Sequence, residues 1–417
     1  MPAEREPTAA PADVEGPGGA PGPAPAPRSA APERLLTVGF ALVTLSTFSY
    51  FLALGALLPT LPRYVEHGLG GGSIAVGVVV GSFAIAAALL RPFAGRVGDL
   101  RGRRILVIGG SALVGVSVLG YAFVDSLGPL IALRLVTGVG EAAMWVGAAT
   151  AIQDMAPEHR RGEAASYFSV ALYAGLAFGP LLGEWLRTEH GYRSVWIAAG
   201  CLALLASAFG LGTPRDVPAE PQPFRLLHPT AIPPGAVLLL GLLPFVGFSA
   251  FVSLYGPTVS IDDVAPLFLV YGGLVLVIRV VGARLPDQLG WRRASTAALV
   301  TLGVAGLLLG AWGAAAGVWI SMVFLALGMS LLFPALFSAL IASVPPEERG
   351  QAVGTFSLAF DLANGLGPPL LGVVVSLSSY RMAFAVSGAL SLAALVIVPR
   401  LTVRNVPSAA EVAGDPA

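Results

Sequence analysis

The sequence predicts an all-α integral membrane protein with twelve transmembrane helices in two pseudo-symmetric six-helix bundles. Three observations predict this fold. Hydrophobic residues make up 55% of the chain and charged residues 12%, about half the usual charged share of soluble domains. Apolar segments of roughly 20 residues, the length that spans a bilayer as a helix, recur along the chain. The two halves of the chain also match each other in sequence.

The internal repeat is carried by charged and turn-forming residues. The match runs from the second apolar segment to the last at one constant offset, which indicates a duplicated unit. Two similar membrane halves with a cavity between them are the architecture of a secondary transporter. The matched pairs include Arg91 with Arg279, Asp99 with Asp287, Gly102 with Gly290, Arg104 with Arg292, Gly179 with Gly367, and Pro180 with Pro368. The same offset places Tyr173 at the repeat position of Asp361, where the two residues differ.

Polar, proline-rich stretches divide the chain into domains. Residues 1–33 are rich in Pro, Ala and Gly and contain no long apolar run, which predicts a disordered tail and not a signal peptide. We expect an N-terminal bundle at 34–212, a linker at 213–231, a C-terminal bundle at 232–402 and a tail at 403–417. The expected helices lie near 36–61, 74–97, 104–124, 127–153, 163–187, 193–212, 233–257, 264–285, 294–314, 316–342, 351–376 and 381–402.

The placement of arginine predicts the orientation. Lysine is absent, and most arginines fall in or beside segments that are cytoplasmic when the N-terminus is inside. The positive-inside rule then places both termini and the linker in the cytoplasm, in a multi-pass protein of the inner (cytoplasmic) membrane. One arginine, Arg134, lies within a helix, and the arginines expected outside are Arg63, Arg187, Arg193 and Arg381.

A glycine- and arginine-rich loop joins the second and third expected helices. Residues 95–104 read Gly-Arg-Val-Gly-Asp-Leu-Arg-Gly-Arg-Arg, in which glycines permit a tight turn and Asp99 can pair with arginines. The loop is either a positive-inside anchor or a charge latch that closes the cytoplasmic side, and its duplication favours the latch. Asp154, at the inner end of the fourth helix, is expected to pair with Arg101 or Arg104. The predicted cytoplasmic gate comprises Gly95, Asp99, Arg101, Gly102, Arg103, Arg104, Asp154, Arg161, Asp287 and Arg292.

Charges inside the expected helices indicate coupling. A charge near the bilayer centre costs about 2.5–3.5 kcal/mol on insertion scales, so it usually faces a cavity or a partner. Arg134 and Glu141 share one face of the fourth helix, and Asp361 lies near the middle of the eleventh. Burial disfavours the charged form of a lone carboxylate, as a proton carrier requires. We expect Glu141, Asp361 and Arg134 to couple protons, with Arg134 holding Glu141 ionised and Asp361 without a nearby arginine. The alternative for Arg134 and Glu141 is a structural ion pair, and the alternative for Asp361 is a hydrogen-bonding role towards the small-residue face.

Aromatic residues on the core helices predict the character of the cavity. Aromatic pockets with few polar groups suit amphipathic organic molecules, although each aromatic side chain can instead be packing. The expected lining residues are Tyr50, Trp145, Tyr173, Phe245, Phe248 and Asn364.

Three motifs resemble the major facilitator superfamily, over residues 34–402. Residues 95–104 look like its loop between helices two and three, and Arg134-x-x-x-Gly138-x-Gly140 resembles its helix-four motif. Gly175, Gly179, Pro180 and Gly183 resemble a helix-five motif associated with antiporters, mostly exporters. The resemblance implies the twelve-helix fold and drug or metabolite export by proton antiport. The chain departs from many such exporters at Glu184, where they carry glycine, and in lacking an acidic residue on helix one.

Other classes of function find little support. No nucleophile elbow and no Gly-x-x-x-x-Gly-Lys loop occurs, all four histidines fall in loops, and the net charge is zero. We therefore expect no enzyme, no metal site, no cofactor and no nucleic-acid partner. The prediction is a monomeric transporter that exports a small amphipathic compound in exchange for protons. The alternatives are an uptake symporter or uniporter, or a non-transporting membrane sensor.

Overall fold

The computed structural model describes residues 35–157, 160–214, 227–281, 289–345 and 348–401. The expected tails, most of the linker and Asp287 lie outside these residues. Within them, eleven helices are long and apolar enough to cross a membrane, and a shorter apolar helix covers Ala265–Arg279. The predicted all-α, twelve-helix membrane fold is confirmed.

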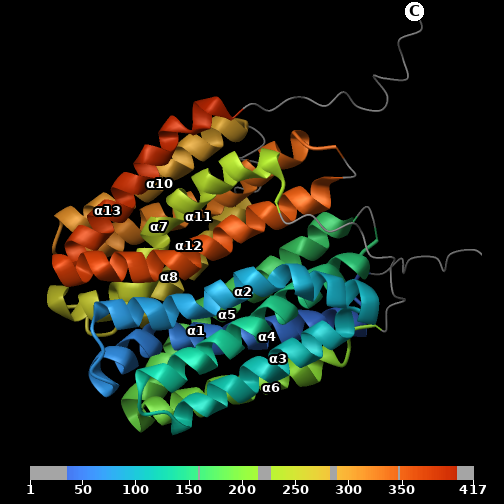
Figure 1. The fold of residues 1–417 in the computed structure, drawn as a ribbon, viewed down its shortest axis with the longest axis horizontal. Helices are drawn as coiled ribbons and strands as arrows, with labels where there is room; N and C mark the ends of the chain where they lie inside the picture. The colour runs from blue at the N-terminus through green and yellow to red at the C-terminus, as the bar shows by residue number, and fades with distance from the viewer. Residues whose placement is uncertain (1–34, 158–159, 215–226, 282–288, 346–347, 402–417) are drawn as a thin grey trace, which may run out of the picture.

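The first six helices form one bundle, in the lower part of Figure 1. Single glycines with positive φ make its tightest turns: Gly102 (φ 88°) separates α2 from α3, and Gly191 (φ 80°) separates α5 from α6. A side chain at such φ values is strained, so these turns require glycine. The helices are α1 (Val38–Arg63), α2 (Ser73–Arg101), α3 (Arg103–Gly120), α4 (Leu127–Asp154), α5 (Arg161–His190) and α6 (Tyr192–Gly210).

The last six described helices form the second bundle, in the upper part of Figure 1. Gly290 (φ 74°) precedes α10, as its repeat counterpart Gly102 precedes α3. The helices are α7 (Ile232–Tyr255), α8 (Ala265–Val281), α10 (Trp291–Ala311), α11 (Ala315–Ala342), α12 (Arg349–Leu377) and α13 (Tyr380–Ala393), the last continued by short 3₁₀ turns to Arg400.

Small residues let α5 lie directly on α1. A Cβ added to Gly179 would stand 2.6 Å from Gly55 Cα, one on Gly175 would stand 2.7 Å from Leu52 N, and one on Gly183 would meet the carbonyl of Ala56. The glycine stripe of the helix-five motif, with Pro180 inside the helix, therefore packs two helices of the same bundle. Close backbone approach of this kind holds membrane helices together where water expulsion cannot.

The two bundles meet most tightly at one end. We call the end where α1 begins the inner end, which the arginine placement predicts to be cytoplasmic, and the opposite end the outer end. The first part of α2 packs on the last part of α12: a Cβ on Gly372 would stand 2.5 Å from Ser73 O, and one on Gly81 would meet Gly365 O. Towards the inner end, a Cβ on Gly95 or Gly354 would meet no neighbour within 4 Å. Among these glycines, the close contacts between the halves therefore lie towards the outer end.

Candidate functional site

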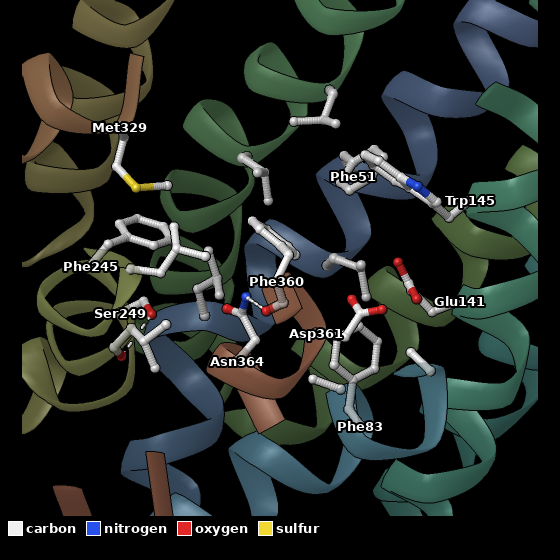
Figure 2. A pocket seen from close by; sticks show the side chains of 18 of the residues that line it. Phe51, Phe83, Glu141, Trp145, Phe245, Ser249, Met329, Phe360, Asp361 and Asn364 are labelled. Carbon is white, nitrogen blue, oxygen red and sulfur yellow. Dashed lines mark hydrogen bonds between the residues drawn. The ribbon is translucent and has the colours of Figure 1, made fainter. Parts of the chain in front are cut away.

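A cavity of about 460 Å³ lies between the two bundles. Its walls come from α1, α2, α4 and α5 of the first bundle and from α7, α8, α11 and α12 of the second, so the repeat surrounds it symmetrically. The lining is mostly apolar and aromatic, and Figure 2 shows Phe51, Trp145, Phe245 and Phe360 around it. The volume lies within the range of sites for drug-sized ligands, roughly 300–1,000 Å³.

Arg91 on α2 connects two carboxylates across the bundle interface. Its Nη2 lies 3.1 Å from Glu141 Oε1 on α4 and 3.0 Å from Asp361 Oδ1 on α12. The carboxylates are 6% and 3% exposed, and they face each other on one side of the pocket in Figure 2. We call Arg91, Glu141 and Asp361 the charge triad. One guanidinium shared by two carboxylates joins the first bundle to the second at the cavity wall.

The triad corrects two expectations. Asp361 does have a nearby arginine, and the arginine that holds Glu141 is Arg91 rather than Arg134. Arg134 Nε donates to Val79 O at 3.0 Å and its Nη2 to Val80 O at 3.1 Å. Arg134 and Glu141 are two helical turns apart, about 10 Å along the axis, so the carboxylate meets the cation of the adjacent helix first. Arg134 instead fastens α4 to α2.

Four of the six expected lining residues reach the cavity: Trp145, Tyr173, Phe245 and Asn364. Asn364 Nδ2 donates to Phe360 O at 2.9 Å within α12, as Figure 2 shows. Tyr50 and Phe248 do not line it, because both are fully buried in helix packing. Tyr50 packs edge-on against Phe51, and Phe248 packs against Phe268. In their place Phe51 and Tyr271 line the pocket.

The expected cytoplasmic gate is only partly described. Asp154 pairs with Arg103, at 3.4 Å, and not with Arg101 or Arg104. This follows from the turn at Gly102, after which Arg103 begins α3. Arg292 Nη2 donates to Leu401 O at 3.2 Å, within the second bundle. Gly95 lies in α2, Arg161 is exposed at the start of α5, and the side chain of Asp99 lies outside the described residues, as Asp287 does.

Sequence reasoning missed a polar cluster at the outer end. Arg63 Nη1 lies 2.5 Å from Glu184 Oε1, its Nε donates to Ser253 O at 2.9 Å, and its Nη2 donates to Asp262 O at 2.8 Å. Glu184 also pairs with Arg187, at 2.6 Å. Arg63 and Glu184 are each 6% exposed. We call this cluster the outer clasp, because Arg63 on α1 holds two carbonyls of the second bundle.

The missed residues had signals in the sequence. Arg91 is one of the duplicated charges, and it stands ten residues before the end of α2, well inside the helix. Glu184 replaces a glycine expected at the end of the helix-five motif. A charge that interrupts an apolar segment indicates a partner, but the sequence does not say which helix supplies it.

Comparison with known proteins agrees with this architecture. The family model of the Major Facilitator Superfamily matches residues 43–322 and 259–417. An uncharacterized MFS-type transporter of Pseudomonas aeruginosa is 31% identical over 399 residues, covering 91% of this chain and 97% of the relative. An uncharacterized MFS-type transporter of Salmonella typhimurium is 29% identical over 368 residues, covering 85% and 94%.

Solved structures share the fold. The human organic anion transporter MFSD10 matches with a TM-score of 0.66 at 20% identity, covering 87% of this chain and 99% of that one. The nucleoside transporter NupG matches with a TM-score of 0.71 at 14% identity, covering 87% and 99%. At identities this low, the likeness shows a shared fold and says nothing about the substrate of this chain.

Proposed function

This chain belongs to the major facilitator superfamily of membrane transporters, and from that premise we propose that it exports a small amphipathic organic compound in exchange for protons. The observation that carries the proposal is the charge triad. Asp361 of the second bundle and Glu141 of the first are held by one arginine, beside an apolar cavity. A proton gained or lost by Asp361 changes a contact between the two halves.

The proposed cycle uses the triad as a proton-controlled contact. With both carboxylates ionised, Arg91 links α4 and α12. Protonation of Asp361 removes its attraction to Arg91 and so weakens the link between the bundles, whereas the pair of Arg91 with Glu141 lies within the first bundle. Alternating access in this fold comes from rocking one half against the other, and a link whose strength depends on protonation makes that motion depend on protons.

Arg134 takes a supporting part in this proposal. Its two bonds to carbonyls of α2 fix the distance between α2 and α4, and therefore between Arg91 and Glu141. Export rather than uptake is supported by the resemblance of the helix-five motif to that of exporters. We also propose the cytoplasmic membrane, with both termini inside, and a monomeric transport unit; arginine placement supports the orientation.

The test is proton movement in proteoliposomes with an imposed pH gradient, for wild type and Asp361→Asn, during addition of a panel of amphipathic compounds. We expect compound-triggered proton flux in wild type and a loss of at least about tenfold in the variant. Asp125→Asn is the matched control, because Asp125 is an exposed carboxylate outside the cavity.

Other outcomes separate the alternatives. Substrate movement without proton flux in wild type contradicts antiport and leaves a uniporter. Proton movement in the same direction as the compound indicates a symporter. Flux that survives Asp361→Asn but is lost in Glu141→Gln transfers the carrier to α4. A compound that binds and never crosses the membrane supports the sensor.

A further inference from the structure

The repeat places a second arginine at the cavity, but this arginine has no carboxylates like those that pair with Arg91. Arg279 on α8 is the repeat counterpart of Arg91 on α2, and both line the cavity. At the same offset, Glu141 corresponds to Met329 and Asp361 to Tyr173, and both of these also line the cavity. The second copy of the charge triad therefore has its cation and lacks both anions.

The geometry of the second copy follows that of the first. Arg91 meets Asp361 of the opposite bundle, and Arg279 lies over the ring of Tyr173 of the opposite bundle, at 4.7 Å from the ring centroid. Within the described residues, Arg279 has no carboxylate within ion-pair distance, and its buried Nε has no hydrogen-bond partner.

The charged side chains that line the cavity have a net charge of +1 when all are ionised. The lining contains the three arginines Arg91, Arg134 and Arg279, and the two carboxylates of the triad. Both carboxylates are bound to Arg91, and Arg134 is satisfied by carbonyls. An unpaired cation beside apolar walls is costly, and an anion placed there lowers that cost.

The rest of the second copy is apolar. Phe245 stacks on Tyr271 with ring centroids 5.0 Å apart, and Figure 2 shows Phe245 and Met329 on the side of the pocket opposite Glu141 and Asp361. Aromatic and thioether groups suit the apolar body of a ligand. A planar guanidinium suits a carboxylate, which it binds through two parallel hydrogen bonds.

We infer that Arg279 is an anion-binding residue of the cavity and that the transported compound is an organic carboxylate with an apolar body. The substrate carboxylate would bind the guanidinium of Arg279 from within the cavity, as the carboxylates of the charge triad bind Arg91, with its body against Phe245, Tyr271 and Met329. This inference rests on the proposed function, since it takes the cavity to be the substrate site, and it narrows the substrate from amphipathic compounds to organic anions.

The test is equilibrium binding to the purified full-length protein in detergent, by isothermal titration calorimetry at neutral pH. The probes are 1-naphthaleneacetic acid, 4-phenylbutyric acid and indole-3-acetic acid, each compared with its neutral primary amide. We expect wild type to bind the acids at least about tenfold more tightly than the amides, because a hydrogen bond to a charged group contributes that much.

Variants assign the preference to one residue. Arg279→Gln should abolish the preference for acids while leaving amide binding unchanged, and the retained amide binding shows that the variant is folded. Arg279→Lys should keep part of the preference. Arg193→Gln is the matched control, because Arg193 also lies over an aromatic ring, Phe123 at 5.6 Å, but is exposed and outside the cavity.

Four results would overturn the inference: acids and amides binding wild type equally, a preference that survives Arg279→Gln, equal loss of acids and amides in that variant, or no binding of any probe to wild type. The proton-flux experiment remains separate. If wild type prefers acids but shows no proton flux, the anion site is supported and proton antiport is contradicted. If wild type shows proton flux but no preference for acids, antiport is supported and the anion site is contradicted.

Discussion

The outer clasp should hold the outer end of the transporter closed, and Arg63→Gln tests this directly. The substitution removes two hydrogen bonds from a charged donor to Ser253 O and Asp262 O of the second bundle. It leaves no unpaired buried carboxylate, because Glu184 keeps Arg187 at 2.6 Å. The variant should therefore fold and differ mainly in the balance between its outer-closed and outer-open forms.

The size of the shift follows from those two bonds. A hydrogen bond to a charged group contributes about 1.5–3 kcal/mol, so the outer-closed form loses about 3 kcal/mol or more. Since about 1.4 kcal/mol is a factor of ten, the ratio of open to closed molecules rises about 100-fold. An outer-open form present at about 1% in wild type would rise to about half.

The assay is thiol labelling from the outer side of the membrane. The native thiol is removed by Cys201→Ser, and a reporter is introduced by Ser249→Cys, at a cavity position on α7. A membrane-impermeant maleimide added to intact cells should label this protein slowly and its Arg63→Gln derivative at least about tenfold faster. In inside-out vesicles both should be labelled, because the proposed export requires the cavity to open to the inner side.

Two results would refute the reasoning. Labelling from outside that does not change in Arg63→Gln would show that the clasp does not hold the outer end closed. Equally faster labelling in Arg193→Gln, whose arginine is exposed outside the clasp, would show a general effect of charge near the membrane surface.

Further predictions concern packing and turns. Gly179→Leu should lower the free energy of unfolding by about 2 kcal/mol or more and lower the melting temperature, because even its Cβ would stand 2.6 Å from Gly55 Cα on α1. Gly109→Ala is the control: its Cβ would have no neighbour within 4 Å, so it should not lower the melting temperature. Gly102→Ala should cost about 1 kcal/mol or more through its positive φ, with similar loss of thermal stability in Gly290→Ala. Arg134→Gln should lower the free energy of unfolding by about 2 kcal/mol, since two carbonyls of α2 lose a charged donor. An unchanged melting temperature would contradict the role of Arg134 in fastening α4 to α2.

The helices were predictable because the bilayer imposes a local rule. A segment must be long and apolar enough to span the bilayer, whichever helices lie beside it. All twelve expected segments correspond to described helices. The turn at Gly102 was predictable for a similar reason, since only glycine adopts its φ without strain. Trp145 and Tyr173 could be assigned to a cavity because two duplicated halves imply a cavity between the halves.

The sequence by itself thus determined the helices, their duplication and the presence of charges that need partners. The tertiary structure alone decided which partners those charges have: Arg91 bridges Glu141 and Asp361, Arg134 meets carbonyls of α2, and Arg63 holds the second bundle. It also buried Tyr50 and Phe248 in packing. The physical reason is that hydropathy and glycine act within one segment, whereas a partner depends on which helices are adjacent and how each is rotated about its axis.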